Sequence, residues 1–542
     1  MSSQSRAWRE AGPPGAILGL LLALGLAVLA LAPLTYPGFF QARSGYLPAL
    51  NAAHIEVAPH WGSPAEGDRP VGSLQAEGRL PYLLAQPFLA LSGSGVTAVK
   101  WGYGLAFLLG AAGTYGWTRR RLGNRGATLA ATVYTFLPWH LSAVYTRGAY
   151  AEAWLWALWP FLLWAVDGVG HRRECSRGLA GILASLALAI ALLAMTFWTQ
   201  AGLAALALPL IVAYALVVHL PRRPVVPLVG MALLLLIPLA VAAAAADGSA
   251  GSSAPQFLYP FQLFVDGRGE GLSFQLGTVA AGLAVVALAL GAGRRGEADP
   301  LLAGLGRRLW FWAGALLVVL ALTLPLTAPL WRVTAFDALV AQPWQALALA
   351  GPPLAFLAGA TVRLDRRLAA LPALAGLLAL VILASYPRLA PEFTPIDPGS
   401  EPVAAFDTGR GPAAPEPEAA GGTAHVLLLD YRVQPPTEIT PTLTLTLTWQ
   451  AVAPVEADYT VFVHLLAGEE KVAQRDSQPC DGECPTSTWQ PGRIVVDRHA
   501  ISLPPEAPAG PYRLAVGLYL LETGDRAAVL GRDDRTVYLN VY

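Results

Sequence analysis

Residues capable of acid–base chemistry gather in a short segment near the start of the chain, soon after a long apolar run. Five ionisable side chains lie within residues 51–68: His54, Glu56, His60, Glu66 and Asp68. A carboxylate near a membrane surface can have a raised pKa and accept a proton from an acceptor. Glu56 and Asp68 are therefore candidate catalytic bases, and His54 and His60 are candidate substrate-binding residues. The alternative is a polar loop that covers a helical bundle.

A divalent metal ion is a second hypothesis for this segment. His54, Glu56 and His60 follow one another at spacings of two and four residues. The HExxH pattern of zinc sites does not occur, and no third ligand is identified. The residues therefore indicate no certain cofactor, and no metal ligand is assigned.

A second group of candidates lies in the segment "VYTRGAYAEAWLWALWPFLLW", residues 144–164. Arg147 can hold a phosphate group through its planar guanidinium, and Glu152 can orient or pair with that guanidinium. The alternative is a structural ion pair beneath an aromatic belt at the membrane interface. Arg332 and Trp344 lie in another loop, residues 328–348, and complete the set of candidate substrate-binding residues.

The elements that must position these residues are membrane-spanning helices. Of the 542 residues, 55% are hydrophobic and 13% are charged, whereas soluble chains carry about 25% charged residues. The net charge of zero gives no support for a nucleic-acid partner. Apolar runs near the length of a bilayer span occur at 14–34, 96–117, 126–143, 150–167, 178–197, 199–220, 225–246, 276–292, 309–327, 344–361 and 369–386. Residues 1–386 are therefore predicted to form an α-helical polytopic bundle of about eleven transmembrane helices.

The arginines alternate regularly with these apolar runs. Clusters at 119–121, 172–173 and 307–308 fall on one side of the membrane if successive spans alternate in direction. The positive-inside rule places these clusters and the N-terminus in the cytoplasm. The loops that hold the candidate residues, and everything after residue 386, are then expected outside. Lysine occurs only at positions 100 and 471, which suggests a GC-rich bacterial genome and hence a bacterial plasma membrane.

The chain after residue 386 has a different character. Residues 387–422 are rich in Pro, Gly, Ala and Glu and are predicted to be a linker. The strict alternation of "TLTLTLTWQ", at 442–450, predicts a half-buried strand, and similar segments follow it. Residues 423–542 are therefore predicted to form an all-β sandwich outside the membrane. There, Cys480 and Cys484 can close a disulfide, whereas a zinc knuckle would need two more ligands.

These segments resemble those of bacterial polytopic membrane glycosyltransferases of the GT-C superfamily. The nearest likeness is to many-span membrane proteins related to 6-pyruvoyl-tetrahydropterin synthase and to mannosyltransferase-like proteins. Four stretches carry it: "YPGFF" at 36–40, the segment 80–123, the arginine–glutamate segment that begins "LPWHLSAVYTRG", and "AQPWQ" at 341–345. The likeness covers roughly residues 10–390 and consists of diffuse apolar motifs.

The resemblance implies transfer of a sugar from a polyprenyl-phosphate donor at the outer face of the membrane. The acceptor, a glycan or a protein, is unknown. An outer carboxylate would serve as the base, and arginines would steady the phosphate leaving group. The chain departs from the pattern at Ser44, where the family places an aspartate, and at Gln345, where it places an arginine. A serine is no base at neutral pH without help. The alternative is therefore a catalytically inactive membrane scaffold or assembly subunit whose β-sandwich binds a protein or glycan partner.

Overall fold

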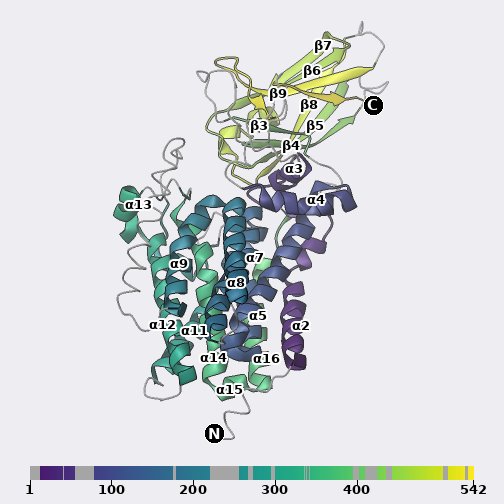
Figure 1. Cartoon of the computed structure of the whole chain (residues 1–542). Helices are drawn as coiled ribbons and strands as arrows, with labels where there is room; N and C mark the ends of the chain where they lie inside the picture. Colours follow the sequence, from purple (N-terminus) through teal and green to yellow (C-terminus); the bar gives the residue numbers. More distant parts are fainter. Residues whose placement is uncertain are drawn as a thin grey trace. The chain divides into compact units, whose positions relative to one another are not determined.

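The computed structural model describes most of the chain (Figure 1). The described residues are 13–40, 42–54, 78–174, 179–219, 256–265, 273–293, 300–334, 336, 339–340, 342–394, 402–408, 424–434, 442–504, 511–530 and 535–541. The chain forms two compact units, each built from two stretches of sequence. The helical unit combines Met1–Thr35 with Tyr103–Pro391, and the second unit combines Tyr36–Gly102 with Glu392–Tyr542.

The helical unit contains long apolar helices. Its main elements are α2 (Pro13–Leu29), most of α5 (Gly95–Thr135), α6 (Pro138–Tyr145), α7 (Tyr150–Glu174), α8 (Leu179–Thr199), α9 (Ala201–His219), α11 (Thr278–Gly293), α12 (Pro300–Thr323), α13 (Ala328–Thr334), η6 (Pro343–Ala350), α14 (Gly351–Leu364), α15 (Arg366–Ala369) and α16 (Leu371–Ser385). The predicted span 96–117 and the first part of the span 126–143 are joined in α5, whose backbone breaks from helical geometry at Gly123, and the rest of the second span lies in α6. Figure 1 shows α7 and α8 in the middle of this unit, and they pack against each other.

Three segments in the described part of the chain are long and apolar enough to cross a membrane: Gly304–Thr323, Pro343–Leu364 and Leu371–Leu389. The middle one is 94% buried, whereas the last is only 22% buried. Large apolar side chains such as Leu317 and Leu383 are exposed, at 68% and 67%. Such surfaces suit lipid, so this is a membrane protein. The predicted number of about eleven spans is not reached among the described residues, and the run 225–246 lies outside them.

Small residues let the central helices pack closely. A Cβ atom on Gly359 of α14 would lie 2.5 Å from the carbonyl oxygen of Gly126 in α5, and one on Gly126 would lie 2.8 Å from that of Gly359. These two backbones are therefore in direct contact, as is typical of helix pairs in membranes, where packing replaces the hydrophobic effect between helices.

Among the described residues, the second unit contains two larger antiparallel sheets. One has five strands in the order β10-β3-β4-β5-β8, and the other has four in the order β11-β9-β6-β7. The strands are β3 (Ala404–Asp407), β4 (Val426–Gln434), β5 (Thr442–Ala451), β6 (Tyr459–Ala467), β7 (Glu470–Ser477), β8 (Ile494–Ser502), β9 (Tyr512–Leu520), β10 (Ala528–Val529) and β11 (Val537–Asn540).

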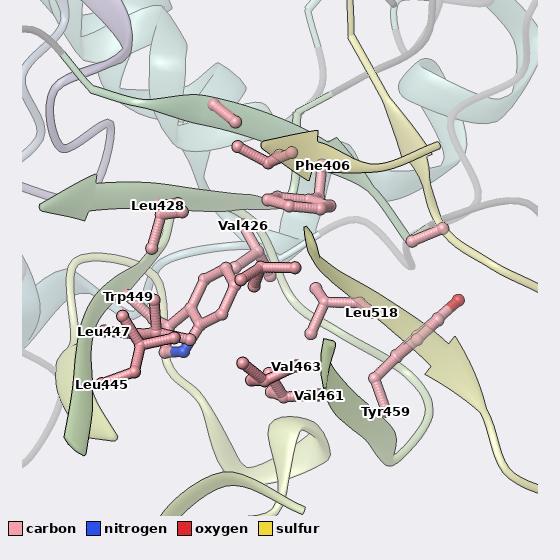
Figure 2. Close-up of a cluster of buried hydrophobic side chains, with 14 of the residues drawn as sticks. Phe406, Val426, Leu428, Leu445, Leu447, Trp449, Tyr459, Val461, Val463 and Leu518 are labelled. Carbon is pink, nitrogen blue, oxygen red and sulfur yellow. The ribbon is translucent and has the colours of Figure 1, made fainter. Parts of the chain in front are cut away.

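Both sheets contribute to one apolar core, which is how a β-sandwich is built. Figure 2 shows Phe406, Val426 and Trp449 of the five-stranded sheet gathered with Val461 and Leu518 of the four-stranded sheet. Along β5, leucines are buried and threonines are half-exposed, as the alternation predicts. Cys480 and Cys484 form a disulfide, with their Cα atoms 5.4 Å apart.

The described residues between Tyr36 and Gly102 belong to the same compact unit as these strands, whereas the predicted boundary at residue 386 places them in the helical domain. Within them lie β1 (Phe39–Phe40), α3 (Leu47–His54) and α4 (Leu80–Ser92). β1 pairs with β2 (Phe393–Thr394). The backbone N–H of Tyr46 donates to Gln450 Oε1 of β5 at 3.2 Å, and the Gln450 side chain is fully buried. The second unit therefore combines Tyr36–Gly102, the first loop segment, with the β-strands.

Candidate functional site

The candidate site lies in the helical unit, where the turn between α6 and α7 brings Arg147 beside Glu152. Gly148 has a positive φ of 69°, which lets the chain reverse before α7 begins at Tyr150. Glu152 stands in the first turn of α7, where the helix dipole favours a negative charge. Arg147 Nη2 donates to both carboxylate oxygens, at 2.8 Å to Oε1 and 2.7 Å to Oε2. The side chains are only 8% and 3% exposed, so this is a buried ion pair.

Aromatic side chains complete the surroundings of Arg147. The guanidinium carbon lies 4.4 Å from the ring centre of Trp139, on α6, and 5.3 Å from that of Trp344, on η6. The two indoles meet edge to face at 5.9 Å. Phe274 contacts both, with ring centres 5.9 Å and 5.7 Å apart. The cation therefore rests on the negative faces of two indoles, which stabilises a buried charge further.

A second buried ion pair occupies the same unit. Arg308 Nη2 of α12 donates to Asp167 Oδ1 of α7 at 3.0 Å, and both side chains are 3% exposed. Nearby, Trp117 Nε1 donates to Tyr214 OH at 3.1 Å, and Tyr214 packs on Trp312. The Arg308–Asp167 pair joins α12 to α7 through a polar contact. Arg147, by contrast, also contacts two indole rings.

Part of this cluster is predicted from the sequence. Arg147, Glu152 and Trp344 are among the predicted residues, and the structure brings them together. Trp139 and Phe274 are not among them. Trp139 lies only eight residues before Arg147 in "LPWHLSAVYTR", which is the signal that was available. Asp167 was also missed, although it is a lone acid at the end of the apolar run 150–167. The binding role of the named residues stays a prediction.

The other predicted site residues do not join this cluster in the described structure. His54 is the last residue of α3, in the second unit, and its side chain lies outside the described part. Glu56, His60 and Asp68 lie outside the described residues altogether. Arg332 belongs to α13, and only its backbone is described. Within the described ranges, no three His, Cys, Asp or Glu residues are grouped so that they could hold a metal ion.

A hydrolase-like set of side chains occurs in the β-strand unit, but its histidine and aspartate are fully buried. His499 Nε2 lies 2.6 Å from Asp497 Oδ2, and Ser477 Oγ lies 3.4 Å from His499 Nδ1. The histidine and the aspartate are 0% exposed. Asp497 also accepts the backbone N–H of Cys480 at 2.9 Å. Asp497 therefore holds the backbone of the disulfide loop at Cys480, and the buried histidine is not open to a substrate.

Comparison with solved structures gives three remote matches, two of which are described here. No family model and no curated protein matches the chain. A crystal structure of ArnT from Cupriavidus metallidurans bound to undecaprenyl phosphate is similar at 15% sequence identity, with a TM-score of 0.29 over 65% of this chain and 78% of that one. The apo state of the same protein matches at 15% identity and a TM-score of 0.27, over 63% and 76%. The likeness is remote in both sequence and superposition.

Proposed function

We propose that this protein is a membrane glycosyltransferase-like protein that transfers a sugar from a polyprenyl-phosphate donor at the outer face of the membrane. The observation that carries the proposal is Arg147, a buried cation held by Glu152 and by two indole faces inside an apolar helical unit. Burying an ionisable group in a membrane protein is costly, and Arg147 differs from the equally buried Arg308 in its contact with two indole faces. A guanidinium suits phosphate because its planar donors match phosphate oxygens.

In the proposed reaction, the bond between the sugar's anomeric carbon and the phosphate oxygen breaks. The electron pair stays on the phosphate, and the positive charge of Arg147 stabilises this leaving group. Glu152 keeps the guanidinium in one orientation through Nη2. An acceptor hydroxyl forms the new bond to the anomeric carbon and gives its proton to an outer carboxylate. Glu56 and Asp68 are the proposed bases, since Ser44 stands where a carboxylate is expected.

The placement of the reaction outside the membrane rests on the distribution of arginines. The clusters at 119–121, 172–173 and 307–308 belong in the cytoplasm under the positive-inside rule. Arg147 then lies at the opposite, outer end of its helices. The Cys480–Cys484 disulfide agrees with this direction, because disulfides persist in oxidising compartments outside the cytoplasm.

Binding of undecaprenyl phosphate to the purified full chain tests the proposal. The key variant is Arg147→Gln/Glu152→Gln, which removes both charges of the candidate site. The matched control is Arg308→Gln/Asp167→Asn, which removes the other buried ion pair of the same unit. Losing the charge-assisted contact to the phosphate should weaken binding about 10- to 100-fold in the first variant. The control should bind as the native protein does.

Native mass spectrometry in detergent, with a titration of the lipid phosphate, gives the readout. Equal binding in the native chain and in the Arg147→Gln/Glu152→Gln variant would remove Arg147 from the site. For the base, release of polyprenyl phosphate from a lipid-linked sugar should be lost in Glu56→Gln or in Asp68→Asn. Unchanged turnover in both variants would contradict the assignment of either residue.

A further inference from the structure

One end of the helical unit carries a large excess of positive charge. Residues 117–126 of α5, 300–312 of α12 and 361–370 at α14 and α15 together contain nine arginines and one acid, Asp365. Residues 294–299, which precede α12, add two arginines and two acids. Figure 1 shows α15 at the lower end of the helical unit. We call the three arginine-bearing segments the arginine end.

The segments of the arginine end belong to helices that pack against one another. Trp117 of α5, Trp312 of α12 and Phe356 of α14 meet in a three-ring junction, with ring centres 5.4 Å, 5.7 Å and 6.2 Å apart. Arg125 Nη1, on α5, donates to the carbonyl oxygen of Ala369, on α15, at 2.8 Å. Arginines that are far apart in the sequence are therefore brought to the same end of one helix junction.

Two of these arginines lie on the helix faces that form the junction. Arg121 follows Trp117 by four residues and Arg308 precedes Trp312 by four, and residues four apart share a face of a helix. Arg308 pairs with Asp167 through Nη2. In the described part of the chain, the Nε atoms of both arginines are buried and have no hydrogen-bond partner. The positive-inside rule concerns charges in loops, so it does not explain buried guanidinium donors that an anion would satisfy.

The exposed surface beside the arginine end changes along the helices as a lipid molecule does. On α12, Arg307 is exposed, Trp310 is 42% exposed, and Leu317 is 68% exposed. Leu317 lies about 15 Å along the helix from Arg307, which is about half the thickness of the hydrocarbon core. Beyond α15, the exposed Arg367 is followed one turn later by Leu371, which is 66% exposed. Charge, aromatic ring and leucine thus match headgroup, interface and acyl chain in order.

We infer that the arginine end binds the headgroup of an anionic phospholipid from the surrounding bilayer. The planar donors of Arg121 and Arg308 match phosphate oxygens, and basic pockets between membrane helices are suited to anionic headgroups. A soluble phosphate would make no use of the exposed leucines beside the arginines. The inference does not depend on sugar transfer, because Asp167, the partner of Arg308, lies about 22 Å along α7 from Glu152.

Native mass spectrometry of the purified full chain tests the inference. The chain is titrated in detergent with phosphatidylglycerol and, separately, with phosphatidylcholine that has the same acyl chains. The key variant is Arg121→Gln/Arg307→Gln/Arg367→Gln, which takes one arginine from each segment of the arginine end and leaves the Arg308–Asp167 pair intact. The matched control is Arg432→Gln/Arg498→Gln/Arg513→Gln, which removes the same charge from three exposed arginines of the second unit.

The native chain and the control should prefer phosphatidylglycerol, and the key variant should bind this lipid about 10- to 100-fold more weakly. Phosphatidylcholine should bind equally weakly to all three proteins. Equal binding of the two lipids to the native chain, or an equal loss in the control, would overturn the inference. Displacement of the lipid by inorganic phosphate at equal concentration would assign the site to a soluble anion and would also overturn it.

Two further variants keep the test decisive. Arg307→Glu/Arg367→Glu changes only exposed side chains and should also abolish the preference for phosphatidylglycerol, so it replaces the key variant if that protein fails to fold. The Arg147→Gln/Glu152→Gln variant should bind phosphatidylglycerol as the native chain does. Failure of the present inference is therefore distinguishable from failure of the proposed polyprenyl-phosphate site.

Discussion

At the scale of single residues, Arg147 depends on groups from three separate elements. Glu152 comes from α7, Trp139 from α6 and Trp344 from η6. The spacing of five residues between Arg147 and Glu152 indicates a pair in the sequence. The indoles cannot be assigned in this way, because Trp344 lies almost two hundred residues further along the chain. Only the packing of η6 near α6 brings it to the guanidinium.

Arg308, like Arg147, has partners that only the tertiary structure brings to it. In the sequence it belongs to a cluster of arginines that the positive-inside rule places in the cytoplasm. In the structure it is 3% exposed and paired with Asp167. A buried ion pair costs desolvation, and removing one partner leaves an unpaired charge that destabilises by about 3–5 kcal/mol. For this reason, the lipid-binding experiment replaces both members of each ion pair, Arg147–Glu152 and Arg308–Asp167.

His464, on β6, makes the stability of the β-strand unit depend on pH. Burial lowers the pKa of His464 from its usual value of 6.5 and outweighs Asp476, which raises it, while Lys471 and Arg526 lower it further. The unfolded chain therefore binds a proton at His464 more readily than the folded chain does. Stability should fall as the pH drops below 6.5, toward the folded-state pKa, and be fully regained above 6.5.

Hydrogen exchange of peptides from β6 and β9, corrected for the intrinsic effect of pH, measures this dependence. His464→Asn should flatten the dependence of hydrogen exchange on pH between about pH 5 and pH 7. A histidine in an unfolded chain titrates in this range. An identical profile in the native chain and in the variant would show that other groups carry the pH dependence.

At the scale of elements, the first loop segment and β5 are held together by a glycine. Gly45 has a φ of +52°, and a Cβ atom there would collide with Oε1 of Gln450. That same oxygen accepts the backbone N–H of Tyr46. Nearby, Gly492 has a φ of +92°, and a Cβ atom there would lie 3.1 Å from the carbonyl oxygen of Ala42. Two close approaches thus bind residues 42–46 to the end of the five-stranded sheet.

Gly45→Ala should loosen this contact. The substitution combines an unfavourable backbone conformation with a steric clash, and the expected cost is about 1–3 kcal/mol. Gly468→Ala is the control, since Gly468 has a similar φ of +63° and open space around its Cβ position. Hydrogen exchange of residues 39–54 should accelerate in Gly45→Ala alone. Equal acceleration in both variants would mean that backbone strain, and not the contact with Gln450, is responsible.

At the scale of the whole molecule, one compact unit is assembled from segments separated by almost three hundred residues. Residues 36–102 add β1, α3 and α4 to strands that begin after residue 391. The large apolar core, however, draws its residues from 404 to 539 only. The β-strands therefore form their apolar core without the first loop segment, which packs at the end of the sheet.

A fragment of residues 392–542 should accordingly fold by itself. We expect cooperative thermal unfolding, an intact Cys480–Cys484 disulfide and a buried Trp449, because the core and the disulfide lie inside the fragment. Gln450, which is fully buried in the whole chain, should become accessible to solvent. Circular dichroism and tryptophan fluorescence provide the measurement. A fragment without cooperative unfolding would show that residues 36–102 belong to the folding core.

The sequence by itself determined the membrane class, the apolar helices and the strands of the C-terminal region, because these depend on composition and on short periods. It also indicated the Arg147–Glu152 pair and the Cys480–Cys484 disulfide, whose partners are close in the chain. Only the tertiary structure decided that Tyr36–Gly102 joins the unit of the β-strands, that Trp139 and Trp344 meet at Arg147, and that Asp167 pairs with Arg308. Those contacts join segments far apart in sequence, and apolar patterning says which face of a helix is buried but not what covers it.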